Sequence, residues 1–339
     1  MSKRRALWFL VLVLVGLPIL AGGCQQSTVV GTERRPIQLY LAPSGRQAVS
    51  LESGEAIATF LEAQTGYAFE VRAPATQSDL VEEFGASDNH VMAFVPAKGY
   101  VLAADRHGAD VALVTVRYGW GFTWAQYLVA CDSEITSLQQ LHGRSWAYPD
   151  AASTTGYLVP ASNLVQHGIE PGERVVAGGH PQSVRAVYEG QADFATTFFS
   201  PPGEEGDWQI GDPPQPMGEI EIVEDRGAVR AYAGDLRIRD ARTGILSAHR
   251  DVLERVCILA ISDPIPNEAV SFSGGFPAAA RESIVQALLD YAETEEGLAV
   301  LGNAEFYGIS GFTRVDDSMF DPVRDMIYGL ELEEGDILH

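Results

Sequence analysis

Short apolar runs and amphipathic segments alternate along most of this chain. Residues 37–42 (IQLYLA) have the apolar character of a strand, and residues 54–66 place Ile57, Phe60 and Leu61 on one face of a helix that Gly66 ends. The same succession of strand and helix continues to residue 199. This alternation predicts βαβ units and a mostly parallel sheet, and therefore an α/β fold.

The alternation falls into two successive runs. The first has strands at 37–42, 67–73, 90–95 and 110–116, and the second has strands at 126–131, 145–150, 173–179 and 192–199. Two such runs suit two lobes joined by crossing strands, with a ligand cleft at the carboxyl ends of the strands. We expect the following division of the chain: lobe 1 from 37–125 and 267–325, lobe 2 from 126–266, hinge strands near 125–131 and 262–268, and a C-terminal tail at 326–339.

Residues 201–238 interrupt this rhythm with prolines, glycines and acidic residues. We interpret the segment as an insertion in lobe 2 that contains a small hairpin, with strands at 219–224 and 228–233. After it the pattern predicts one long helix at 277–297 and a last helix that begins at residue 321.

The first residues of the chain have the order of an export signal. A basic segment, an apolar run and small residues precede Cys24, which indicates a lipoprotein signal peptide at 1–23 with lipidation of Cys24. Ala21 stands where such signals usually have leucine, and an uncleaved anchor or a plain secretory signal is the alternative. A polar tether at 24–36 would follow. We expect an exported protein, anchored to a membrane through Cys24 and facing the periplasm or the cell exterior.

Charge and rare residues exclude several classes of function. The 46 acidic and 23 basic residues give a net charge of −23, which argues against a nucleic-acid partner. The only lysines are Lys3 and Lys98, so the chain has no P-loop. We expect no cofactor and no metal. Cys131 and Cys257 lie in apolar runs, and we favour two buried free thiols over a disulfide between them.

Residues 150–160 (DAASTTGYLVP) place three hydroxyl side chains and a glycine between a predicted strand and a predicted helix. The first amides of a helix lack intrahelical acceptors and favour an anion. Ser153, Thr154 and Thr155 add neutral donors, and Gly156 permits close approach of the backbone. Because Pro160 disfavours a continuous helix, we expect a distinct first turn with the regular helix beginning near Pro160. An ordinary helix cap is the alternative.

Two further turns have the same character. His180 follows two glycines at a strand-to-helix turn, and Lys98 and Tyr100 follow Pro96 at another. The alternatives are a structural histidine, a surface lysine and a core tyrosine. Asp193 begins a buried strand, where it is either a ligand acceptor or a strand-edge residue.

Taken together, these segments resemble the phosphate-, phosphite- and phosphonate-binding proteins that serve ABC importers. The resemblance rests on AFVPAKGYVLA, DAASTTGYLVPASNL, GGHPQSVRAVYEGQADFATT and ILAISDPIPNEAV, and on GISGFTRVDDSMFDPVRD near the C-terminus. It covers most of residues 37–325. It implies a two-lobed, hinged, type II periplasmic-binding-protein fold that closes on a phosphorus oxyanion. The ligand-binding residues that it implies are Ser153, Thr154, Thr155, Gly156, Tyr100, His180 and Glu268.

The sequence departs from this family's pattern in three places. Val95 replaces a common glycine, Ser78 lies where a tyrosine is usual, and FFSPP after residue 197 lacks the acid that holds a ligand amine. An aminoalkyl phosphonate is therefore disfavoured, and phosphate, phosphite and other phosphonates remain open. Lys98 is a candidate to compensate.

The resemblance implies a monomeric solute receptor that delivers its oxyanion to an ABC permease. A lipoprotein that senses the same ligand for a signalling receptor is an alternative. An exported hydrolase is a third hypothesis, but the chain has no HExxH, no GxSxG and no P-loop.

Overall fold

The computed structural model describes residues 29–42, 47–86, 88–151, 153–203, 206–215, 218–225, 227–303, 306 and 308–330. The predicted signal peptide and Cys24 lie outside these residues. In the part of the chain that the structure describes, no helix is both long and apolar enough to cross a membrane.

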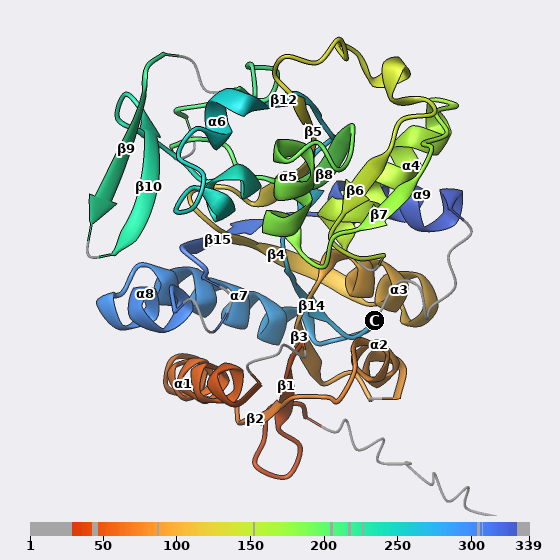
Figure 1. Cartoon of the computed structure of the whole chain (residues 1–339). Coiled ribbons are helices and arrows are strands. Elements are labelled where there is room, and N and C mark those ends of the chain that lie inside the picture. The colour runs from red at the N-terminus through yellow and green to blue at the C-terminus, as the bar shows by residue number, and fades with distance from the viewer. Residues whose placement is uncertain are drawn as a thin grey trace, which may run out of the picture.

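Two six-stranded sheets form the centres of two lobes (Figure 1). The sheet of lobe 1 has the order β15-β4-β14-β3-β1-β2. Its strands are β1 Ile37–Leu41, β2 Phe69–Arg72, β3 Val91–Val95, β4 Asp110–Val116, β14 Ala269–Phe272 and β15 Gly311–Arg314. The sheet of lobe 2 has the order β12-β5-β8-β6-β7, with β13 paired to β5. Its strands are β5 Phe122–Ala130, β6 Trp146–Tyr148, β7 Arg174–Val176, β8 Phe194–Phe199, β12 Val256–Ile261 and β13 Ile265–Pro266.

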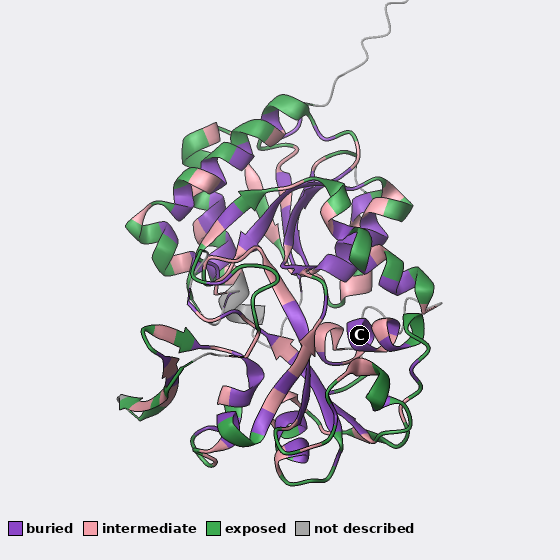
Figure 2. Cartoon of the chain, turned by 90° about the horizontal axis from the view of Figure 1, so that it is seen from above, coloured by how far each residue is buried: buried purple, intermediate pink, exposed green. Residues whose placement is uncertain are grey.

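Helices cover both faces of the lobe 1 sheet. Apolar side chains on one face pack with α1, α7 and α8, and those on the other face pack with α2, α3 and α9. In lobe 2, α5 and α4 contribute to separate apolar clusters on the sheet. Buried residues accordingly concentrate in the strands, while the outer helix faces are exposed (Figure 2). The helices are α1 Gln47–Thr65, α2 Gln77–Ala86, α3 Ala97–His107, α4 Val159–Gln166, α5 His180–Tyr188, α6 Val252–Arg255, α7 Ala278–Ala292, α8 Glu295–Leu301 and α9 Asp321–Gly329.

The sheets are only partly parallel. β1 pairs in parallel with β2 and β3, and β6 pairs in parallel with β7 and β8, as the alternation predicts. The pairings of β14, β15, β5 and β12 are antiparallel. The prediction of a mostly parallel sheet is therefore wrong for these strands. The physical reason is that the chain enters lobe 2 at β5 and returns to lobe 1 at β14, and each of these two strands runs antiparallel to the neighbours on both of its sides.

The first crossing is shorter and earlier than expected. The chain leaves β4 at Val116 and enters β5 at Phe122 through a tight turn at 117–120, whose ends exchange two backbone hydrogen bonds of 2.9 Å. Residues 125–130 lie within β5, where pairing with β8 and β12 holds them in the sheet. The second crossing passes through Asn267 and Glu268, within the predicted range. The Asn267 amide donates to Thr115 O at 3.0 Å and Trp120 O at 2.9 Å, and so ties the two crossings together.

Several local expectations change. From residue 29 the chain belongs to lobe 1 and is no tether, because Val30 is buried and Ala68 N donates to Gly31 O at 2.9 Å. The predicted long helix is divided into α7 and α8, since Thr294 Oγ1 accepts from Gly297 N at 2.9 Å and caps a new helix. α9 continues to Gly329, past the expected start of the tail.

The insertion forms the predicted hairpin and one more strand. β9 Ile220–Asp225 and β10 Ala228–Ala233 pair antiparallel, and β11 Leu236–Ile238 extends the sheet beside β10.

The expectation of free thiols is wrong: Cys131 and Cys257 form a disulfide. The antiparallel pairing of β5 with β12 brings the two cysteines together, since Cys257 lies opposite Val129.

Candidate ligand-binding site

The hydroxyl-rich segment forms a π-helical turn, Thr154–Leu158, between β6 and α4. Ser153 Oγ accepts from Gly156 N at 3.1 Å, and the backbone amides of Tyr157 and Leu158 donate to Ser153 O at 2.9 Å. These bonds are made within the turn, whereas the Thr154 and Thr155 amides occupy its start, where a helix provides no acceptor. The turn is thus built in the way that an anion cradle requires.

Gly156 is required at its position by close packing. A Cβ there would lie 2.4 Å from Pro149 Cδ and 2.8 Å from Ser153 Oγ. Thr196 on β8 donates to Gly156 O and accepts from Trp146 Nε1 at 2.7 Å, which anchors the turn to the sheet. Pro160 lies in the first turn of α4, directly after the π-helical turn, and Gly156 O, four residues before it, accepts from the Thr196 hydroxyl where the proline has no amide to donate. The prediction of a distinct first turn before Pro160 is confirmed.

A lysine from lobe 1 and a histidine from lobe 2 lie near this turn. Lys98 on α3 is 6% exposed, and burial lowers the pKa of its amine to about 8, although the Asp150 carboxylate counteracts the shift. His180 begins α5, and burial lowers the pKa of its ring below the ordinary value, again against the influence of Asp150. Asp150 lies immediately before the turn, so one carboxylate acts on both groups. His180 lies on the same side of lobe 2 as the turn, because its ring contacts Phe198 at 5.0 Å and Phe198 lines one cavity together with Thr155.

The polar atoms of this site are not all satisfied within the protein. His180 Nδ1 is buried and has no hydrogen-bond partner among the described residues. Because an unpartnered buried polar atom is costly, such an atom indicates a position where a ligand completes the hydrogen bonding. At neutral pH the lowered pKa keeps this ring uncharged, so it offers a hydrogen bond without a formal charge.

A cavity of about 320 Å³ adjoins Thr155 and extends to the crossing strands. Its wall contains Thr155 and Phe198 from lobe 2 together with Arg117 and Asn267 from the crossings. Arg117 is paired with Glu268, whose Oε2 accepts from Arg117 Nη2 at 2.7 Å and from Thr115 Oγ1 at 3.0 Å. Glu268 therefore holds Arg117 at the cavity, which differs from the direct ligand contact that the family resemblance implies.

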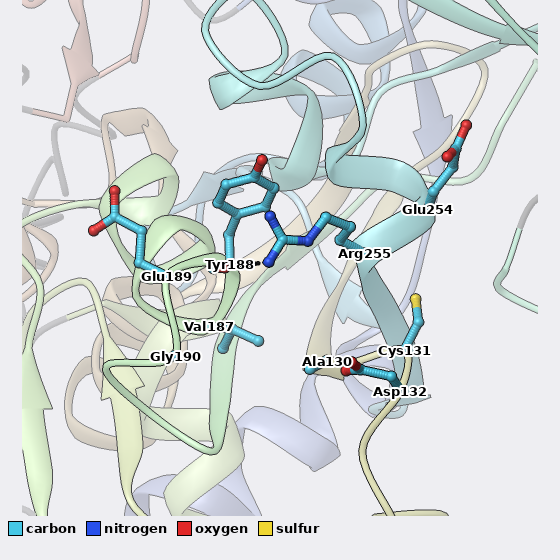
Figure 3. Close-up of a pocket in the computed structure, with 9 residues that line it drawn as sticks. All are labelled: Ala130, Cys131, Asp132, Val187, Tyr188, Glu189, Gly190, Glu254 and Arg255. Atoms are coloured by element: carbon cyan, nitrogen blue, oxygen red, sulfur yellow. Dashed lines mark hydrogen bonds between the residues drawn. The ribbon is translucent and has the colours of Figure 1, made fainter.

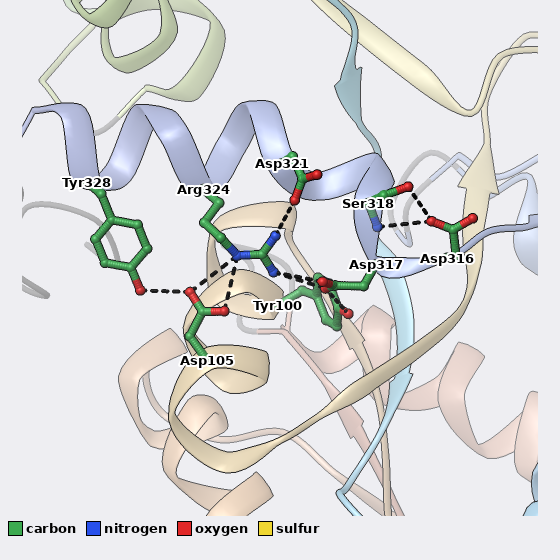
Figure 4. Close-up of polar contacts among 8 residues, drawn as sticks. All are labelled: Tyr100, Asp105, Asp316, Asp317, Ser318, Asp321, Arg324 and Tyr328. Atoms are coloured by element: carbon green, nitrogen blue, oxygen red, sulfur yellow. Dashed lines mark hydrogen bonds and ion pairs between the residues drawn. The ribbon is translucent and has the colours of Figure 1, made fainter.

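Tyr100 does not join this site. Its side chain is fully buried, its hydroxyl donates to Asp317 Oδ1 at 2.7 Å (Figure 4), and its ring packs on Phe320 with centroids 4.4 Å apart. The reason is helical geometry: two positions along α3 turn a side chain by about 200°, so Lys98 and Tyr100 point in nearly opposite directions. Burial and the Asp317 carboxylate raise the pKa of Tyr100.

Asp193 is also remote from the site. It precedes the first residue of β8, where its carboxylate accepts from Ser145 N at 2.8 Å and Ser145 Oγ at 2.7 Å, and these bonds lower its pKa although burial raises it. The cavity lies at the other end of this strand, about 20 Å away for six residues at 3.3 Å each. The structure therefore places Asp193 at the edge of the strand, away from the hydroxyl-rich turn and its cavity.

Sequence reasoning missed several residues of the site. Asp150 is the last residue of the predicted strand that precedes the hydroxyl cluster, and Asn267 directly precedes Glu268 in PIPNE. Arg117 and Trp120 flank Tyr118 and Gly119, whose φ values of 54° and 82° form the crossing turn. The sequence feature that indicates this turn is Gly119, which lies in a two-residue gap between apolar runs.

A larger cavity, of about 600 Å³, lies at the far end of lobe 2 beside Cys131 (Figure 3). The guanidinium of Arg255 lies over the Tyr188 ring at 4.2 Å and donates to Tyr188 O at 3.3 Å. The other charged residues that line this cavity are Asp132, Glu189 and Glu254. These carboxylates disfavour an anion, and the cavity is separate from the hydroxyl-rich turn.

The fold and the site define a two-lobed solute-binding protein, and the comparisons agree. A family profile described as "ABC transporter, phosphonate, periplasmic substrate-binding protein" matches residues 39–320. The chain therefore belongs to this family of phosphonate-binding periplasmic components of ABC transporters. Its members are solute-binding transport proteins and not enzymes, which implies a small ligand, a membrane permease as partner, and export.

Solved structures show the same type II periplasmic-binding-protein fold. XAC2383 from Xanthomonas citri bound to ATP aligns with a TM-score of 0.59 at 17% identity, over 87% of this chain and 97% of that one. PhnD1 from Prochlorococcus marinus in complex with methylphosphonate aligns with a TM-score of 0.51 at 12% identity, over 87% and 98%. Comparison with curated protein sequences gives no match.

Proposed function

We propose that this protein is the solute receptor of an ABC importer and that it binds a phosphorus oxyanion between its lobes. The observation that carries the proposal is the turn of Ser153–Gly156, whose first amides lack helical acceptors, together with the buried and unpartnered Nδ1 of His180. The Asp150 carboxylate directly before the turn acts on both His180 of lobe 2 and Lys98 of lobe 1, which supports a place for both at the ligand. The turn supplies hydroxyl and amide donors, the histidine one further hydrogen bond, and the lysine a cation. Membership of the phosphonate-binding family supports the choice of ligand.

Neutral donors reconcile an anionic ligand with a net charge of −23. Surface charges are screened over about 8 Å at physiological salt, whereas hydrogen bonds in a closed cleft are short and desolvated. The negative surface slows the approach of an anion without preventing its binding. Closure of the lobes about Arg117–Gly121 and Asn267–Glu268 would bring Lys98 and the turn onto the same ligand.

The test is calorimetric titration of residues 25–339 with phosphate, phosphite, methylphosphonate and sulfate. We expect saturable binding of at least one phosphorus oxyanion, and the double variant Thr154→Val, Thr155→Val should lose about 100-fold or more in affinity, because each hydrogen bond to a charged group contributes about 1.5–3 kcal/mol. Thr313→Val, on the exposed face of β15, is the matched control and should bind like the wild type. Unchanged affinity in the double variant would contradict the site.

Transport is the role that we propose for the bound ligand. Cells that depend on the oxyanion for growth should lose its uptake when this protein is removed, while conversion of the ligand by the purified protein would favour an enzyme. Uptake that persists, together with capture of a signalling receptor, would favour the sensing role.

We also propose that the protein acts as a monomer tethered through a lipid on Cys24. The expected result is that the full chain sediments with membranes and that Cys24→Ser moves it to the soluble exported fraction. Retention of the serine variant in the membrane fraction would instead indicate an uncleaved apolar anchor.

A further inference from the structure

The cavity beside Thr155 is larger than an inorganic oxyanion requires. Its volume of about 320 Å³ corresponds to roughly ten water molecules at about 30 Å³ each, and it falls in the range of cavities that hold organic ligands. Phosphate, with one phosphorus and four oxygens, would leave most of this space unfilled. The remaining space adjoins the turn, where an organic substituent of a bound oxyanion would extend.

Four aromatic side chains contribute to the wall of this space. They are Tyr118, Trp120, Phe122 and Phe198, and the other lining residues are Arg117, Thr123, Thr155, Ser200, Pro201 and Asn267. Aromatic side chains prefer flat, apolar partners, which they contact by stacking or edge-to-face packing. A planar organic group is therefore better matched to this wall than a flexible or strongly hydrated one.

The aromatic wall is held in place by packing outside the cavity. The Trp120 ring meets Trp124 at 5.6 Å and Trp208 at 5.7 Å between centroids, both edge to face. Trp208 belongs to the insertion and is 4% exposed, so this segment supports the cavity wall from behind. Phe198 is in turn contacted by the His180 ring at 5.0 Å, which joins the aromatic wall to the oxyanion end.

The charges of the wall decide between a neutral and a cationic substituent. Aromatic rings also bind ammonium groups, but here Arg117 lines the same cavity. Its guanidinium would repel a ligand cation, and Glu268, which could attract one, is already paired with Arg117 at 2.7 Å. Among the residues that the structure describes, none that lines this cavity carries a carboxylate. An uncharged substituent therefore fits this cavity better than an aminoalkyl group.

We propose that the ligand is an organophosphonate or organophosphate whose substituent is planar and uncharged, with the oxyanion at the turn of Ser153–Gly156 and the planar group against Trp120, Phe122 and Phe198. This inference rests on the proposed function and adds the substrate class. It assigns the specificity of the site to the crossing turn and the end of β8, and it gives the insertion a role in forming the wall.

The experiment compares phenylphosphonate, methylphosphonate and 2-aminoethylphosphonate by calorimetry with residues 25–339. The wild type should bind phenylphosphonate at least tenfold more tightly than either of the other two. Phe122→Ala should reduce the ratio of phenyl to methyl affinity at least fivefold, and Phe122→Leu, which keeps an apolar side chain, should reduce it less. Thr155→Val should weaken both ligands and leave the ratio unchanged.

The possible failures are distinct. Equal affinity for phenyl- and methylphosphonate, tighter binding of aminoethylphosphonate, or an unchanged ratio in Phe122→Ala would overturn the substrate class while the proposed function stands. Absence of binding to every phosphorus oxyanion would overturn the proposed function itself.

Discussion

Lys98 shows how strongly one residue depends on its place in the fold. The sequence contains only one other lysine, Lys3, and on charge alone Lys98 would be a surface residue. Burial on α3 instead brings the pKa of its amine to about 8, close to physiological pH. The charge of this amine, and with it the affinity for an anion, therefore changes within an accessible pH range.

We expect anion affinity to fall as the pH rises through about 8. An anion binds the protonated amine preferentially, and above this pKa the free protein must first take up a proton, so the affinity falls by up to tenfold per pH unit. Lys98→Arg should retain affinity without this decline, because arginine stays charged. Lys98→Met should bind weakly at every pH.

The measurement is the dissociation constant of methylphosphonate between pH 7 and pH 9.5 for the three proteins. Comparison of wild type with Lys98→Arg at each pH cancels the titration of the ligand itself. The titration of His180 does not contribute to the pH dependence in this range, because burial lowers its pKa below the ordinary value. Parallel curves for wild type and Lys98→Arg would contradict the role of Lys98.

At the scale of the elements, local sequence patterns determine which segments become strands and helices, and long-range contacts determine how these elements are arranged. The strands and helices around Lys98, Thr154 and His180 follow from the hydrophobic periodicity and the turn residues. The sequence therefore predicts these elements and the turns on which the three residues lie. The antiparallel entry of β14 and the location of Asp193 depend on which strands become neighbours, which no local pattern specifies. Tyr100 was misplaced for a different reason, since its motif indicated the right turn but not which side of α3 faces the cleft.

Polar contacts of Arg324 and Tyr328 fasten α9 to lobe 1 (Figure 4). Arg324 bonds to Asp105 on α3 at 3.1 Å, to Asp317 at 3.0 Å and to Asp321 at 2.6 Å, and Tyr328 donates to Asp105 at 2.7 Å. The apolar face of α9 contacts α4 of lobe 2, where both helices line a small cavity. The helix therefore contacts both lobes.

Arg324→Met should lower the free energy of unfolding by about 1–3 kcal/mol, because three carboxylates lose their common partner at a position that is 20% exposed and only partly screened. Arg314→Met, which breaks a single exposed pair with Glu282, should cost less, because solvent screens this pair. Urea denaturation followed by circular dichroism measures both. Equal costs for the two variants would show that the Arg324 network adds nothing beyond a surface pair.

At the scale of the whole molecule, the disulfide is a covalent cross-link within lobe 2. Cys131 and Cys257 are 126 residues apart, and the chain between them forms most of lobe 2, whereas lobe 1 has no such covalent link among the described residues. An exported protein can keep such a bond, since it leaves the reducing cytosol. Unfolding of lobe 2 should therefore be the step that depends on oxidation.

We expect the double variant Cys131→Ser, Cys257→Ser to destabilise lobe 2 by about 2–5 kcal/mol, since the cross-link restricts a long loop in the unfolded chain. Ligand affinity should change less than twofold, because the disulfide and the cavity lie at opposite ends of β5. Cys131 directly follows the last residue of this strand, whereas Thr123, which lines the cavity, is near its first residue. Thermal scans of oxidised wild type, reduced wild type and the variant provide the comparison. A loss of affinity on reduction would show that the bond shapes the site.

The aromatic support of the cavity has a practical consequence. Three of the five tryptophans in the sequence, Trp120, Trp124 and Trp208, contact one another at centroid distances of 5.6 to 5.7 Å, and Trp120 also lines the cavity. Indole emission depends on the polarity around the ring, so a ligand that displaces water from Trp120 alters the signal of the group. The protein thus carries its own optical reporter of occupancy, and ligands can be screened by intrinsic fluorescence without a label.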